Sequence, residues 1–138
     1  MLNSQGALFL LFVQLGNRML KKMDGQLSFH GVSFTEYQVL HQLSKAERET
    51  MTRIELARSV GLSASGVTRL IAPMEKLGLV EKESHPRDAR ISLVKLSKAG
   101  KKVCKDTSTT VSETALGVFD SLTAVQQKAV GDLLVKLF

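Results

Sequence analysis

Apolar residues recur at helical spacing between residues 52 and 78, and this stretch is predicted to form two helices joined by a short turn. The second helix has the clearer apolar stripe, at positions i, i+3, i+4, i+7 and i+10: Val67, Leu70, Ile71, Met74 and Leu77. Thr52 and Glu55 form a capping box at the start of the first helix, and Gly61 suits its end. Ser63 is placed to cap the second helix, and Gly78 to close it.

Polar residues occupy the opposite face of the second helix: Ser65, Thr68, Arg69 and Lys76. A helix-turn-helix presents its recognition helix in this way, with one face packed on the protein and a polar face turned to the DNA major groove. Two amphipathic helices also pair for purely structural reasons. The helices alone therefore leave both DNA binding and simple packing open.

Residues 79–96 are predicted to form a β-hairpin. LVEKES is a short strand, HPRDA supplies turn residues, and RISLVKL returns with β-branched and apolar residues. A basic-tipped hairpin directly after a helix-turn-helix is typical of a winged helix. The predicted fold class is therefore mainly α with a small β-hairpin wing.

The wing also resembles that of the MarR family (multiple antibiotic resistance regulators) of transcriptional regulators. Asp88-Ala89-Arg90, Leu96-Ser97 and Gly100 match the family's wing pattern of Asp-x-Arg, five residues, Leu-Thr/Ser and a following Gly. The chain length and the flanking helices also fit, so the resemblance covers nearly the whole chain. It implies a winged helix-turn-helix with N- and C-terminal dimerisation helices, bound as a homodimer to a pseudo-palindromic double-stranded DNA operator.

The candidate DNA contacts lie on the recognition helix and on the wing: Ser63, Ser65, Gly66, Thr68, Arg69, Arg87, Asp88 and Arg90. Arg90, at the start of the return strand, is expected to reach the minor groove, whose negative potential attracts arginine, while Asp88 holds its guanidinium. The alternative for this pair is a surface salt bridge without a role in DNA binding. Gly66 either lets the DNA backbone approach closely or has no functional meaning. Pro73 removes a mid-helix hydrogen bond and predicts a kink after the DNA-reading turn.

The positive charge of the chain is concentrated in the same segment. The net charge is +6, and residues 51–105 contain 12 Lys and Arg against 5 Asp and Glu, whereas the rest of the chain has 7 against 8. A basic surface confined to one segment is typical of nucleic-acid contact. The alternative is a solvated cationic face.

The flanking segments are predicted to dimerise. The helix over residues 5–27 is apolar around most of its first half and needs cover on all sides, which one small domain cannot provide. We expect a single domain over residues 1–138, with a DNA-binding head over 33–96 and dimerisation helices in 5–27 and 98–138. The candidate dimer contacts are Leu8, Leu11, Phe12, Leu133 and Leu137. The resemblance likewise implies that the first and last helices pair between subunits.

The remaining elements are predicted from their caps. A capping box at Ser33 and Glu36 begins a helix that ends near Ala46, and residues 47–50 are expected to form a turn. Ser97 caps a long helix to about residue 119, with an apolar stripe of Cys104, Val111, Ala115 and Val118. Thr123 and Gln126 begin the last helix, which runs to residue 138.

Other classes of function find little support. The longest apolar run, residues 7–13, is far shorter than the roughly 20 residues of a membrane span, and a signal peptide is not expected. A single cysteine is compatible with the cytoplasm. His30, His41 and His85 have no partners at metal-ligand spacing, so no metal site is expected. No cofactor loop or catalytic constellation is present, and an enzyme is not expected.

Two regulatory sites are considered. The resemblance implies a small phenolic or amphipathic effector in a cleft between the dimer helices and the head, where Met23, Tyr37 and His41 are candidate lining residues. Cys104 is either a buried apolar residue or a redox sensor whose pKa nearby lysines lower. The favoured interpretation is a homodimeric repressor that a small effector releases. The alternatives are a winged-helix subunit that binds protein, and a regulator that senses redox state through Cys104.

Overall fold

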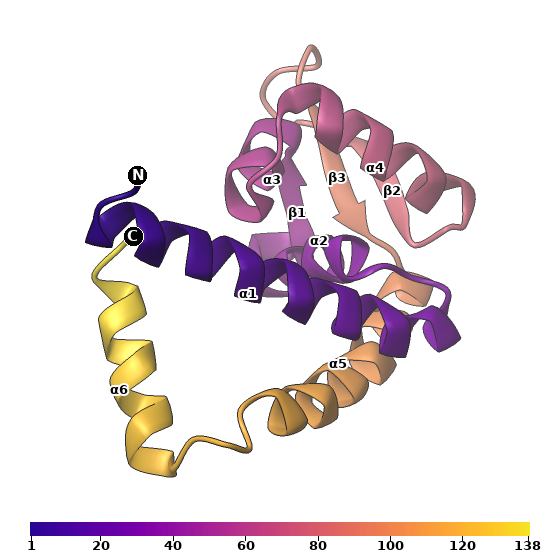
Figure 1. Ribbon diagram of the computed structural model, residues 1–138. Helices are drawn as coiled ribbons and strands as arrows, with labels where there is room; N and C mark the ends of the chain where they lie inside the picture. The colour runs from indigo at the N-terminus through magenta and orange to yellow at the C-terminus, as the bar shows by residue number, and fades with distance from the viewer.

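The computed structural model describes residues 1–138, which form six α-helices and a three-stranded sheet (Figure 1). The helices are α1 (Ser4–Leu27), α2 (Phe34–Lys45), α3 (Arg53–Val60), α4 (Ala64–Lys76), α5 (Lys98–Val118) and α6 (Ala124–Val135). The strands are β1 (Thr50–Thr52), β2 (Val80–Ser84) and β3 (Ser92–Leu96), and short 3₁₀ turns span Ser28–His30 and Glu47–Glu49. The predicted winged-helix fold, mainly α with a small hairpin, is confirmed. None of the six helices combines the length and the apolar character of a transmembrane span.

The helices begin where their caps predict. Ser33, Thr52 and Thr123 each form a complete capping box, because the hydroxyl accepts a backbone N–H and the Glu or Gln three residues later accepts one in return. Ser63 and Ser97 cap α4 and α5 through their hydroxyls. These local bonds fix the start of each helix independently of the tertiary structure.

The sheet has the order β1-β3-β2, with both pairs antiparallel. Strand β1 corrects the predicted turn at residues 47–50, since a 3₁₀ turn ends at Glu49 and Thr50 already pairs with Lys95 of β3. The return strand begins at Ser92, so Arg90 lies in the loop of the wing and not at the start of the strand. The loop of the wing is therefore longer than the sequence predicted.

The core lies where α2, α3 and α4 meet the sheet and the adjoining ends of α1 and α5. Its fully buried large side chains include Leu27, Leu40, Leu43, Leu56, Ile71 and Met74. The predicted stripe of α4 is confirmed at Val67, Ile71 and Met74 but not at Leu77, which is 62% exposed because it caps the end of the helix. Helix α4 continues through Pro73, which faces solvent, so water can bind the backbone carbonyl that this proline leaves unpaired.

The face of α5 that packs against the head contains both apolar and polar residues. Its buried residues are Gly100, Cys104, Thr107 and Thr114. The predicted apolar stripe is correct for Cys104, which is buried, and for Val111, which packs against the core. Ala115 and Val118 are only partly buried, and threonines occupy the inner positions. The Thr107 hydroxyl is buried without a hydrogen-bond partner.

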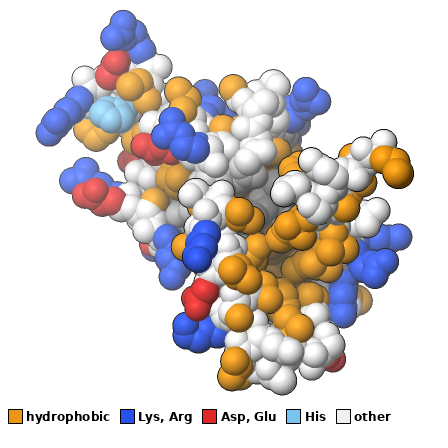
Figure 2. Space-filling model, turned by 60° about the vertical axis from the view of Figure 1, so that its left-hand side comes forward, with side chains coloured by type: hydrophobic (Ala, Val, Ile, Leu, Met, Phe, Trp, Pro, Cys, Tyr) orange, Lys and Arg blue, Asp and Glu red, His pale blue; other side chains and the backbone are white.

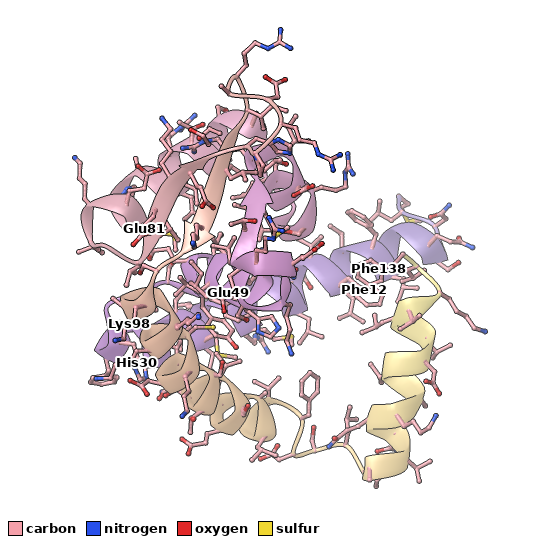
Figure 3. All side chains as sticks on the ribbon, turned by 180° about the vertical axis from the view of Figure 1, so that it is seen from behind. Phe12, His30, Glu49, Glu81, Lys98 and Phe138 are labelled. Carbon is pink, nitrogen blue, oxygen red and sulfur yellow. The ribbon has the colours of Figure 1, made fainter.

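The first half of α1 and the whole of α6 remain uncovered in the single chain. Leu8, Leu11 and Phe12 are 53%, 59% and 43% exposed, and α6 has no buried residue. Hydrophobic side chains gather in one broad area on this side of the molecule (Figure 2). Phe12 lies on α1, and the chain end at Phe138 turns back toward that helix (Figure 3). One chain therefore does not bury its own dimerisation candidates.

Candidate nucleic-acid interface

The helix-turn-helix is held together by local bonds. Gly61 ends α3 with a φ of 69°, a left-handed conformation that glycine adopts without strain. The hydroxyl of Ser63 then accepts the backbone N–H of Gly66 at 3.1 Å and begins α4. An ion pair between Arg53 of α3 and Glu75 of α4, 3.3 Å apart, joins the two helices. The turn consequently sets the orientation of α4.

The outer face of α4 presents short polar side chains and one cation. Ser63, Ser65, Thr68 and Arg69 are all exposed. The Thr68 hydroxyl donates to the carbonyl of Ala64 at 3.2 Å, so its methyl group and the hydroxyl lone pairs remain for contact. The guanidinium of Arg69 has no protein partner. This face can approach a base edge closely and still supply a flexible cation.

Gly66 has a structural explanation. A Cβ at this position would lie 3.2 Å from the Ser63 hydroxyl and 3.5 Å from the Cβ of Leu62. A larger residue would therefore crowd the cap that begins α4. This close contact favours a small residue at position 66, and the close approach of the DNA backbone stays a prediction.

Asp88 organises the loop of the wing. Its Oδ1 accepts the Arg90 backbone N–H at 3.0 Å and the Arg90 Nε–H at 3.1 Å, and its Oδ2 accepts from Nη2 at 3.2 Å. The carbonyl of Asp88 also accepts the N–H of Ile91 at 3.0 Å. A carboxylate that accepts two N–H groups from one edge of a guanidinium fixes its direction as well as its position. The predicted pairing of Asp88 with Arg90 is thus present.

The pair remains charged and accessible. The guanidinium and the backbone N–H of Arg90, in that order, lower the pKa of the Asp88 carboxyl below its ordinary value of 3.8. The Arg90 side chain is 91% exposed, although its direction is fixed by Asp88. The remaining guanidinium N–H groups therefore point into solvent. Arg87 is also exposed and has no carboxylate partner.

The exposed face of α4 and the loop of the wing lie at the same end of the head. The loop of the wing and the first turns of α4 both lie at the top of Figure 1. In Figure 2 the wing forms the projection at the upper left, from which Lys and Arg side chains extend. A cationic loop beside an exposed polar helix matches the combined requirements of minor-groove and major-groove contact.

Comparisons with known proteins agree with this geometry. A model of the MarR family matches residues 30–91. An uncharacterised HTH-type transcriptional regulator from Bacillus subtilis (strain 168), YcgE, is 32% identical over 106 residues, which cover 77% of this chain and 68% of that protein. The chain belongs to the MarR family.

Solved structures of MarR-family proteins have the same fold. Sco3205, a MarR-family transcriptional regulator from Streptomyces coelicolor in complex with DNA, has a TM-score of 0.87 and 25% identity; the match covers 99% of this chain and 88% of that one. A mutant MarR from E. coli complexed with operator DNA also has a TM-score of 0.87, with 23% identity and coverage of 96% and 94%. The winged-helix fold of this chain is therefore that of its family.

The effector residues predicted from the sequence do not line one cavity. Met23 is buried in the core, and Tyr37 is buried with its hydroxyl donating to Ser108 of α5 at 2.8 Å. His41 stacks on Tyr37 with ring centroids 5.8 Å apart. His41 lines a hollow that lies between α2 and α5 and has a volume of about 280 Å³. The sequence missed this hollow because its two walls are 60 residues apart in the chain.

Cys104 is a buried residue of the core. It is 6% exposed, and burial raises the pKa of its thiol above the ordinary value of 9.0, although Ser44, Ser108 and Lys45 partly oppose the change. A redox-sensing cysteine needs a lowered pKa and access to solvent, so the redox-sensor interpretation is not supported. No group of three or more His, Cys, Asp and Glu side chains is arranged to hold a metal ion.

Proposed function

We propose that this MarR-family transcriptional regulator is a homodimeric repressor that binds a pseudo-palindromic operator in double-stranded DNA and contains no catalytic site. The observation that carries the proposal is the shared end of the head, where the exposed face of α4 lies with an arginine held by Asp88. We place the protein in the cytoplasm of a bacterial cell, where operator DNA is accessible.

Each head would make two kinds of contact. The first turns of α4 would enter the major groove, where Arg69 can bind guanine or phosphate and Ser65 and Thr68 can read neighbouring base edges. Arg90 would enter the adjacent minor groove with its guanidinium already oriented by Asp88, so that little side-chain entropy is lost on binding. Arg87 would bind the flanking phosphates.

The uncovered apolar helices support a homodimer. An amphipathic or apolar helix surface of this extent is costly to leave in water, and a second copy of the chain supplies the same surface for pairing. Paired copies of α1 and α6 would place two α4 helices on successive major grooves, about 34–36 Å apart. Leu8, Leu11, Phe12, Leu133 and Leu137 would lie in this interface.

A small effector at the joint between head and dimer helices would control release from DNA. The two heads bind one operator only when their spacing matches the helical repeat. A ligand that favours another spacing shifts the population away from the binding-competent dimer. Phenolic or amphipathic compounds, which the family resemblance implies, would be the first to test against DNA binding.

The experiment is selection of bound fragments from sheared genomic DNA of the source organism at two salt concentrations. The expected result is a pseudo-palindrome that stays enriched at the higher salt. On that operator, Arg90→Ala should weaken binding by about 1–3 kcal/mol, the loss expected for one good arginine contact. Lys102→Ala, which removes an exposed cation of α5 far from the wing, should leave affinity nearly unchanged.

Two results would refute the proposal. Unselective binding that disappears with salt would leave only counterion release, and a winged helix that binds protein would then be the better interpretation. An Arg90→Ala variant with wild-type affinity at physiological salt would show that the wing does not contact DNA.

A further inference from the structure

The hollow between α2 and α5 has a strongly cationic lining. Its residues are His41, Ser44 and Lys45 of α2, and Lys101, Cys104, Lys105 and Ser108 of α5. They occupy one face of each helix, at i, i+3 and i+4 on α2 and at i, i+3, i+4 and i+7 on α5. None of them is acidic. The two facing helices therefore place three lysines and a histidine around one hollow of about 280 Å³.

Two of these lysines lack a balancing charge within the protein. Glu49 pairs with Lys101 at 2.9 Å, and Figure 3 shows Glu49 beside the first half of α5. No carboxylate pairs with Lys45 or Lys105. Lys45 and Lys105 are therefore the two cations of the lining whose charge an anion in the hollow would balance.

The hydrogen-bonding groups of the lining also select an anion. The Ser44 hydroxyl donates to the carbonyl of His41 at 2.7 Å. The Ser108 hydroxyl donates to the carbonyl of Cys104 at 2.7 Å, so it accepts from Tyr37. In these bonds both hydroxyl protons go to backbone carbonyls. The lysine ammonium groups are then the charged donors of the lining, and they favour a ligand that carries negative charge and accepts hydrogen bonds.

We propose that this hollow binds a small dianion, namely a phosphate monoester or a dicarboxylate, between Lys45 and Lys105. Its volume is at the lower limit of small-molecule sites, which favours a compact ligand. Cys104 is the only hydrophobic residue in the lining, and the three lysines supply its charge. This charge favours a dianion, which differs from the phenolic effector considered above.

The dianion would act as a bridge between the head and the dimer helix. Lys45 ends α2, which belongs to the head, and Lys105 lies in the second turn of α5. A ligand bound by both holds these helices in one arrangement. If the proposed function is correct, the same ligand changes operator affinity, and DNA changes ligand affinity by an equal factor. Only this coupling rests on the proposed function.

Calorimetric titration of the full chain with inorganic phosphate, succinate and acetate tests the binding itself. Phosphate is used at a pH where it is doubly charged, and the two dianions distinguish a phosphate site from a carboxylate site. Both Lys45→Gln and Lys105→Gln should weaken the preferred dianion about tenfold or more, the loss expected for a charged hydrogen bond. Lys102→Gln, on the same helix but outside the hollow, is the matched control and should bind as the wild type does.

Glu49→Gln should change dianion affinity in the opposite direction to the lysine variants. It frees the Lys101 ammonium from its ion pair and removes a nearby negative charge, so dianion binding should tighten. A purely structural effect of the substitution would not strengthen binding. The proposal is overturned if no dianion binds at millimolar concentration, if acetate binds as well as either dianion, or if Lys45→Gln and Lys102→Gln bind equally.

Operator affinity measured with and without the dianion separates this inference from the proposed function. Specific DNA binding without any dianion binding refutes the anion site and leaves the proposed function intact. Dianion binding that responds to the lysine variants in a protein that recognises no operator supports the site and refutes the proposed function.

Discussion

Of the glycines in this chain, Gly100 is the one where an added methyl group should lower the free energy of unfolding most. It lies in the first turn of α5, which packs directly on the residues that lead into β2. A Cβ at this position would lie 2.1 Å from the carbonyl oxygen of Leu79 and 2.8 Å from Cδ1 of Leu96. The backbone cannot easily move away, because the N–H of Ser97 donates to that same Leu79 carbonyl and its hydroxyl donates to the carbonyl of Gly78.

The size of the effect follows from two opposing contributions. Alanine in a helix is favoured over glycine by about 1 kcal/mol. Against this, a normal carbon–oxygen contact is about 3.3 Å, so α5 and the Leu79 carbonyl must separate by about 1 Å. Overpacking of a close contact costs roughly 1–3 kcal/mol, and loss of the Ser97 bonds adds about 1 kcal/mol. We therefore expect Gly100→Ala to lower the free energy of unfolding by about 2 kcal/mol.

Urea unfolding followed by circular dichroism measures this change. With the slope usual for a small protein, a loss of about 2 kcal/mol lowers the midpoint by roughly 1 M. Gly25→Ala is the matched control, since this glycine of α1 has no atom within 4 Å of the added Cβ and should gain about 0.5–1 kcal/mol. All variants are compared at one protein concentration, because the proposed self-association would contribute to the apparent stability. A Gly100→Ala protein as stable as the wild type would refute the close packing of α5 on Leu79.

Three further predictions concern the wing, the thiol and the dimer. In Arg90→Ala the pKa of Asp88 should rise toward 3.8, and a ¹³C NMR titration of the carboxyl measures it. In the wild type the folded pKa of Asp88 lies below its unfolded value, so the ion pair is fully formed above pH 3.8 and is lost as the pH falls through the lowered pKa. Cys104 should react with iodoacetamide far more slowly in the folded protein than in urea, since burial shields the thiol and raises its pKa; equal rates would contradict its burial. Leu11→Glu should dissociate the proposed dimer in sedimentation analysis, whereas a wild-type chain that is a folded monomer at micromolar concentration would contradict dimerisation through α1.

The helix boundaries could be predicted because they depend on local chemistry. Ser33, Thr52 and Thr123 cap their helices through residues three positions away, so the sequence alone contains both partners of each bond. The same holds for Asp88 and Arg90, which are two residues apart and form the predicted pair. Interactions of this range do not depend on how the chain folds over longer distances.

The features that could not be predicted depend on distant partners. Strand β1 is only three residues long and exists because it pairs with β3, some 40 residues later. The buried face of α5 includes Thr107 and Thr114. Nothing in the sequence around them distinguishes these buried threonines from exposed ones. The contacts that join α5 to earlier elements, such as Tyr37 with Ser108, span about 70 residues. Nothing in the sequence near either partner indicates the other.

These distant contacts decide how the head is held. The start of α5 is fixed by Gly100 against Leu79 and by Lys101 with Glu49, and its middle by Ser108 with Tyr37 and Thr110 with His30. Beyond them α5 leads to the uncovered α6, through which the proposed dimer would form. A helix of 21 residues is about 31 Å long, so a tilt of about 5° at its base moves its far end by about 3 Å. In such a dimer, the contacts around the first half of α5 therefore set the distance between the two recognition helices. The DNA-facing side chains of α4 can bind only an operator whose half-sites match that distance.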